Sequence, residues 1–219
     1  GFDSDKHLLV GFFGSVELGP LGIDLMDFSV GIPLTHPQDI KDYTLDLGGL
    51  DLTFKGGPVE ISGSFLEMET KVDLPGPPPK EIDVVQYTGA ALIKTEAFSL
   101  SGIGSYASID GAPSMFVFAV LDKNLGGPVF FNVTALAAGF GFKRKLLLPA
   151  IDQVQEFPLV KIISDPAYIA NGDDPEEALT KISEAIPPDP SSYWLAAGVR
   201  FRACEQIETV ALLAVTFGT

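Results

Sequence analysis

The segment from Val129 to Phe142 constrains the fold of this chain more than any other stretch. It is long, carries no charge, is apolar at odd and even positions alike, and becomes rich in Ala and Gly towards its end. Successive residues of a strand point to opposite faces, so a strand of this kind has no side suited to water. It therefore belongs in the interior of a large β structure or in the wall of a membrane barrel.

Strand patterns recur along most of the chain. Alternating apolar residues, bounded by turns rich in Gly, Pro, Asp and Asn, predict about ten or eleven antiparallel strands. The expected strands are 8–18, 22–31, 43–54, 59–71, 82–98, 98–109, 114–122, 129–142, 193–204 and 207–217. We predict an all-β, mainly antiparallel fold in one domain, 1–219: a large twisted sheet, a sandwich or a barrel.

The nearly symmetrical segment 43–54 allows two interpretations. A two-residue turn at Gly48 and Gly49 would place Asp46 opposite Asp51 in a hairpin. A bulge at the same glycines would instead shift the pleat within one long strand. We favour the bulge, because facing aspartates repel each other and the segment 55–58, KGGP, provides a better turn.

The strand pattern stops between Leu148 and Pro190, and we expect an insertion of loops and one short helix there. Residues 174–186 carry the helix signal. Asp174 can cap the first turn, Pro175 suits the first helical position, and two glutamates lie at the positive end of the helix dipole. The two prolines that follow end the helix.

The charge balance excludes several partners. The chain of 219 residues carries 14 Lys and Arg against 29 Asp and Glu, for a net charge of −15. A nucleic-acid-binding protein normally has a basic stripe, and the only basic cluster, 143–145, ends a strand. The acidic charge, the inserted helix and the absence of aromatic belts at strand ends argue against a membrane location. The sequence indicates no cellular compartment.

The residues that usually perform chemistry are few. Two histidines, His7 and His36, lack a nucleophile or acid at a recognisable spacing, and we interpret them as surface residues. With a single cysteine, Cys204, the chain can form neither an internal disulfide nor a zinc site built on thiolates. We expect Cys204 to alternate with Arg200 and Arg202 on one face of its strand. The oxygen-rich segment 171–177 lacks the spacing of a calcium loop, so we expect no metal or cofactor.

Carboxylates are the richest reactive class on the predicted strands. Two of them within a few ångströms could catalyse glycoside cleavage, although strand acids more often face solvent. The candidates are Asp24, Asp27, Asp46, Asp51, Glu67 and Glu69. A carboxylate-dependent, glycan-active enzyme is therefore the weakest of the functions that we consider.

Several phrases of the chain occur together in a familiar order. They are GPVEISG at 57–63, YTGAALIK at 87–94, FSLSGIGSY at 98–106, FNVTALAAGFGF at 131–142, LPAIDQV at 148–154 and WLAAGVR at 194–200. Together they resemble an uncharacterised β-rich domain found within very large microbial proteins. The resemblance implies a module of a larger protein, and it implies no activity and no site residue.

Two functions remain ahead of enzymatic activity. The first is a structural or protein-interaction module whose sheet edges pair with neighbouring segments of the parent protein or with another copy. The second is a barrel or groove that binds an apolar, lipid-like ligand. Candidate lining residues for that ligand are Phe98, Leu100, Tyr106, Phe140 and Phe142.

Overall fold

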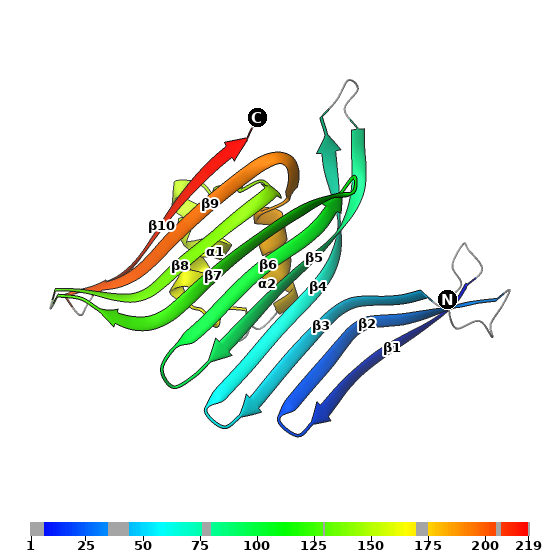
Figure 1. The fold of residues 1–219 in the computed structure, drawn as a ribbon, viewed down its shortest axis with the longest axis horizontal. Helices are drawn as coiled ribbons and strands as arrows, with labels where there is room; N and C mark the ends of the chain where they lie inside the picture. Colours follow the sequence, from blue (N-terminus) through cyan, green and yellow to red (C-terminus); the bar gives the residue numbers. More distant parts are fainter. Residues whose placement is uncertain are drawn as a thin grey trace.

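The chain forms one open antiparallel sheet in which strand order in space follows strand order in sequence (Figure 1). The computed structural model describes residues 7–34, 44–75, 80–128, 130–169, 175–204 and 207–218. Its strands are β1 His7–Leu18, β2 Leu21–Pro33, β3 Thr44–Gly56, β4 Val59–Leu74, β5 Lys80–Lys94, β6 Ser99–Ile109, β7 Ala112–Gly126, β8 Phe131–Arg144, β9 Pro188–Ala203 and β10 Ile207–Gly218. The predicted all-β, antiparallel fold is confirmed, and of the three arrangements left open the single sheet is the one observed.

Short turns connect most neighbouring strands, and glycine supplies much of the positive φ that these turns need. Gly57 has φ 61° in the turn between β3 and β4, and Gly111 has φ 77° between β6 and β7. Both turns were predicted from their Gly and Asp residues. Such local connections let each strand pair with the one before it, which explains why the sheet contains no crossover among its described strands.

The segment 44–56 is one uninterrupted strand, so Gly48 and Gly49 form no turn. Register between β2 and β3 is the same on both sides of Gly48, and the predicted bulge in this strand is therefore wrong. The irregularity lies on β2 instead, where Asp27 has φ 49°. A Cβ on Gly48 would lie 2.9 Å from the Asp27 Cβ, so glycine makes room for that distortion.

The sheet forks beyond Gly49. The pairing of β3 with β4 begins at Gly49 and Leu66, whereas β4 continues to pair with β5 as far as Leu74. Residues 44–48 of β3 therefore pair with β2 alone, and the two arms diverge in Figure 1.

The insertion between β8 and β9 contains three helical segments: η2 (Ile151–Glu156), α1 (Pro158–Ser164) and α2 (Pro175–Ala185). The predicted helix corresponds to α2, while α1 carried too few residues to give a helical period. The proposed cap Asp174 and the rest of segment 170–174 lie outside the described residues, as does His36. Among the described residues, no helix is both long enough and apolar enough to cross a membrane.

The helices cover one face of the sheet, and the main core lies between them (Figure 1). From the sheet, Phe116 and Phe118 of β7 and Trp194 of β9 are at most 1% exposed. From the helices, the buried residues are Leu159, Ile162 and Ile163 of α1 and Ala178, Leu179 and Ile182 of α2. Burial of these apolar side chains on one side holds the insertion to the sheet.

A buried polar layer adjoins this core beside α2. The Arg144 side chain is fully buried and donates hydrogen bonds to Gln86 Oε1 at 2.9 Å, Ser105 Oγ at 3.0 Å and the Ile186 carbonyl at 3.2 Å. The Thr88 hydroxyl joins Ser105 to Ser183 of α2. Burial lowers the pKa of Arg144 to about 10, so the guanidinium remains charged at neutral pH.

Strand β8 lies inside the sheet, between β7 and β9, as its apolar sequence predicted. The structure nevertheless differs from the expectation that neither face meets water. Ala135 and Ala137 are buried under the helices, whereas Leu136 and Phe140 on the opposite face are more than 40% exposed. The helices cover only one face of this sheet.

Candidate interaction surface

The face of the sheet opposite the helices is apolar and uncovered from β5 to β10. We call it the open face. Fourteen of its large apolar side chains are at least 37% exposed: Val85, Tyr87, Ile93, Leu100, Tyr106, Met115, Val117, Leu136, Phe140, Phe142, Leu195, Leu213, Val215 and Phe217. Soluble monomers rarely expose a contiguous apolar patch of more than a few hundred square ångströms, and larger patches mark interaction sites.

Strand register arranges the open face in rows that run across the strands. One row consists of small residues, each opposite the next in the ladder; we call it the small row: Gly63, Ala91, Gly102, Ala119, Ala138 and Ala197. The next residues on the same face, two positions away on each strand, form a second row, whose side chains are large on β7 to β10. We call it the large row: Val117, Phe140, Leu195 and Val215. The small row is therefore a shallow trough beside a ridge.

Outer rows of large residues flank these two. On one side of the small row lies an aliphatic row: Ile61, Ile93, Leu100, Leu121, Leu136 and Val199. Beyond the large row lies a mainly aromatic row: Tyr87, Tyr106, Met115, Phe142, Tyr193 and Phe217. Within it the rings of Phe142 and Tyr193 meet edge to face, with centroids 5.3 Å apart. These rings give the open face a stiff aromatic border.

Four of the five candidate ligand-binding residues lie on the open face. Leu100 belongs to the aliphatic row, Phe140 to the large row, and Tyr106 and Phe142 to the aromatic row. Phe98 precedes β6, in a turn where its carbonyl accepts hydrogen bonds from the Thr95 amide and hydroxyl. Alternation in the sequence thus predicted the face of these four residues. It did not identify Val117 and Leu195, whose neighbours on other strands are visible only in the strand register.

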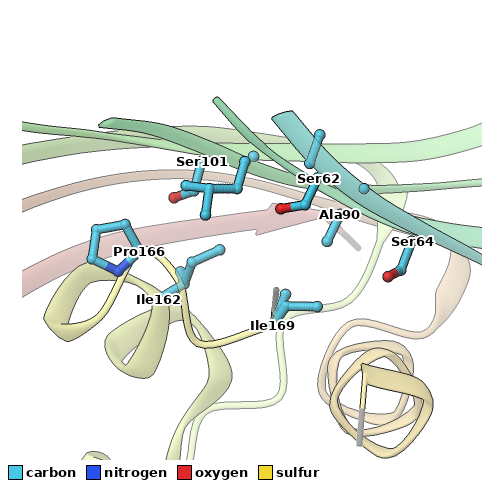
Figure 2. A pocket seen from close by; sticks show the side chains of 11 residues that line it. Ser62, Ser64, Ala90, Ser101, Ile162, Pro166 and Ile169 are labelled. Carbon is cyan, nitrogen blue, oxygen red and sulfur yellow. The ribbon is translucent and has the colours of Figure 1, made fainter. Parts of the chain in front are cut away.

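The covered face contains a very small cavity where α1 and the segment after it meet the sheet. It has a volume of about 10 Å³ and lies between β4 to β6 and residues Ile162, Pro166 and Ile169 (Figure 2). The Ser101 side chain lines it, and its Oγ has no hydrogen-bond partner among the described residues. A cavity of this size holds about one water molecule, which would satisfy the Ser101 hydroxyl.

The strand carboxylates gather in two places near the fork. Asp24 of β2 lies directly opposite Asp51 of β3, rather than Asp46 opposite Asp51. On the open face, Glu67 and Asp46 both lie near Tyr87 and raise the pKa of its hydroxyl, Glu67 more strongly. No cluster of three or more potential metal ligands occurs among the described residues.

Cys204 does not share a strand face with the two arginines as expected. It follows the end of β9 in a turn, with φ 49°, and its amide donates to the Phe130 carbonyl. Arg200 instead forms ion pairs with Asp122 at 2.8 Å and Glu208 at 3.6 Å, and Arg202 pairs with Glu208 at 3.1 Å. These arginines join β7, β9 and β10, a structural role.

The C-terminal strand β10 is an unprotected edge. Within the part of the chain that the structure describes, it has β9 on one side and no strand on the other, and it carries no charged residue after Glu208. A groove of about 370 Å³ lies beside it, lined by Val210, Leu212 and Ala214 of β10 and by residues of the insertion such as Leu148 and Phe157. Natural sheets usually protect such edges with Lys, Pro or a bulge, so this edge is suited to pairing with another strand.

These features define the class: a two-layer β protein with one helix-covered face and one open apolar face. The chain belongs to the DUF6603 family, a family of unknown function, whose model matches residues 1–219. The sequence resemblance to an uncharacterised domain family is therefore confirmed. No curated protein and no solved structure matches the chain.

Proposed function

We propose that this chain is a non-enzymatic structural module that binds protein through its sheet. The open face carries the proposal. It presents fourteen large, well-exposed apolar side chains in one continuous surface, on a chain whose net charge is −15. Covering this surface removes apolar area from water, which is the main driving force of protein association.

The chemistry of the described residues supports binding over catalysis. The open face from β5 to β10 consists mainly of apolar side chains, and its tyrosines lie at the border. Glycoside cleavage would need a pair of carboxylates. The facing pair Asp24 and Asp51 lies on the other side of the sheet, away from the open face. The cavity beside Asp51, of about 110 Å³, is lined mainly by apolar side chains such as Met26, Phe65 and Leu179 and offers few polar partners for a sugar, so the enzymatic alternative gains no support.

Sheet edges provide a second route of association. Strand β10 offers unpaired backbone groups along twelve residues, Ile207–Gly218, and the adjoining groove could receive side chains of an added strand. Addition of a strand would extend the sheet and its open face together. Neighbouring segments of the parent protein and other copies of this chain are the proposed sources of that strand.

Binding of an apolar, lipid-like ligand is the second candidate. The small row favours it, since a trough one residue wide between rows of large apolar side chains has the width of an extended hydrocarbon chain. Mass spectrometry of organic extracts from the purified protein tests this alternative. Recovery of a stoichiometric lipid, lost when Ala119 and Ala138 are both replaced by Leu, would favour ligand binding over protein binding.

The proposed function is tested on a variant in which Val117, Phe140 and Leu195 are all replaced by Thr. These residues are exposed, so the sheet should fold while the open face loses its ridge. We expect light scattering or pull-downs with segments of the parent protein to detect association of the natural chain and not of the variant. A strictly monomeric natural chain that recovers no parent segment would refute the proposal.

A further inference from the structure

We infer that the open face is a self-complementary dimer interface, on which a second copy of this chain packs face to face about a two-fold axis. The inference rests on the proposed function and names its partner. In this arrangement the large residues of β7, β8 and β9 in each copy sit on the small residues of the same strands in the other.

The area of the open face matches what a stable dimer needs. An aromatic side chain has an area of roughly 150–250 Å² and an aliphatic one somewhat less. Fourteen large side chains, five of them aromatic and each 37–69% exposed, therefore present on the order of 1,000 Å² per copy. A specific interface typically buries about 800 Å² on each partner. The open face is therefore large enough without any contribution from the sheet edges.

The row pattern determines the axis. A two-fold axis that runs across the strands, between the small and large rows, brings the small residues of β7, β8 and β9 opposite the large residues of the same strands in the partner. On β10, at the edge, the same axis places Leu213 opposite Val215. Ala138 then meets Phe140, Ala119 meets Val117, and Ala197 meets Leu195, in both directions. Such reciprocity is what an isologous interface requires, and it places large side chains against small ones as a well-packed core does.

The outer rows meet under the same axis. The aliphatic row of one copy lies opposite the aromatic row of the other, so that Leu136 faces Phe142 and Leu121 faces Met115. Glu67 and Asp46 lie beyond the central strands, at the border near Tyr87, where a charged group remains in contact with water. The centre of the interface is therefore apolar on both sides.

A substitution that enlarges the small row distinguishes this packing from general stickiness. Ala138→Phe adds apolar area to the open face, so non-specific association would increase. In the two-fold dimer the new ring occupies the place of the partner's Phe140 ring, and we expect dimerisation to weaken about 30-fold or more, the range of an interface hot spot. The measurement is sedimentation equilibrium over a range of protein concentration.

The exchanged variant Ala138→Phe/Phe140→Ala provides the rescue. It exchanges the large and small positions on β8 alone, so the ring introduced at position 138 of each copy faces the alanine introduced at position 140 of the other. The complementarity is restored at this strand, and the dimer should return to within a few-fold of its natural affinity. Ile151→Asp is the matched control, because Ile151 is 96% exposed but lies in η2, away from the open face. It should leave dimerisation unchanged, and circular dichroism checks that each variant is folded.

The outcomes separate this inference from the proposed function. A natural chain that dimerises, is weakened by Ala138→Phe and is rescued by the exchange supports the two-fold packing. A dimer unaffected by Ala138→Phe overturns it, as does a strict monomer. If that monomer still binds a parent segment through Val117, Phe140 and Leu195, the proposed function stands without the dimer.

Discussion

Trp194 is buried in the core because the residue beside it on the next strand has no side chain. Gly141 of β8 pairs with Trp194 of β9, and a Cβ at position 141 would lie 2.1 Å from the indole Nε1. Gly139 has the same relation to Phe118, at 2.6 Å. The glycines near the end of β8 thus make room for large side chains of the adjacent strands.

Replacing Gly141 by Ala should therefore destabilise the protein. The added methyl group forces Trp194 to move within a closely packed core, which costs roughly 1–3 kcal/mol of unfolding free energy. Urea unfolding followed by tryptophan fluorescence measures it, since Trp194 is the single tryptophan. Gly14→Ala is the control, with no heavy atom within 4 Å of the added Cβ, and it should be neutral or slightly stabilising. Equal stability of the two variants would contradict this account.

Arg144 supplies the second residue-scale prediction. Arg144→Leu removes the donor for Gln86 Oε1 and the Ile186 carbonyl, which lie buried, and leaves Ser105 Oγ with its hydrogen bond to Thr88 alone. We expect a loss of about 2 kcal/mol or more of unfolding free energy, since each orphaned group costs about 1–3 kcal/mol and removal of a buried charge offsets part of this.

Chemical denaturation measures the effect of Arg144→Leu, with Arg202→Leu as its control. Arg202 is half-exposed and pairs with Glu208 at the surface, so its loss should cost less than about 1 kcal/mol. A variant at position 144 that is as stable as the natural protein would mean that the polar layer contributes no net stability.

At the scale of elements, the strands were predictable and the helices were so only in part. Most strands carry a period-2 pattern and end at a turn rich in Gly, Pro, Asp or Asn, so the signal is local. Helix α2 has eleven residues with a clear amphipathic period, whereas α1 has seven, too few for that period to emerge. Packing against β7 to β10 stabilises α1, and packing of that kind is not encoded locally.

The edge strand β10 carries the element-scale prediction. Thr216 is exposed on the helix side of the sheet, so Thr216→Lys adds a charge to the edge without altering the open face. A charged edge should suppress strand addition, because an incoming strand would have to bury or displace the ammonium group. We expect higher-order association at high protein concentration to decrease at least several-fold, as measured by light scattering.

The face-to-face dimer should remain with Thr216→Lys, which separates the edge from the face. The charge-neutral variant Thr216→Ser is the matched control and should associate as the natural chain does. If Thr216→Lys abolished dimerisation together with higher-order association, the edge and not the open face would be the principal contact.

At the scale of the whole molecule, charge and apolar surface act in opposite directions. Each copy carries a net charge of −15, so two copies repel each other at long range. Burial of the apolar open face favours their association at short range. The Debye length falls from about 30 Å at 0.01 M salt to about 8 Å at 0.15 M, so salt screens most of the repulsion.

Dimerisation should therefore strengthen as salt is added. We expect the dimer dissociation constant to fall about tenfold or more between 0.01 M and 0.3 M sodium chloride, as measured by sedimentation equilibrium. An interface held by ion pairs would weaken over the same range. Glycerol at matched viscosity controls for hydrodynamic effects, and a dissociation constant that rises with salt would contradict an apolar interface between acidic copies.

Local patterns in the chain are enough to predict the strands, their antiparallel pairing and the helix α2. Most strands need only their own alternation of apolar and polar residues and the turn that follows. Leu100, Tyr106, Phe140 and Phe142 could also be assigned to strand faces by counting alternate residues.

Which face of the sheet is covered and which is open follows only from the packing of the fold. Strand β8 is apolar on both faces, so its pattern cannot distinguish the side that meets the helices from the side that meets water. The rows of small and large residues arise from the register of several strands, and each strand contributes one residue to each row. A surface assembled across strands has no contiguous signal in the chain, because neighbours within a row lie on different strands and are seven or more residues apart in sequence.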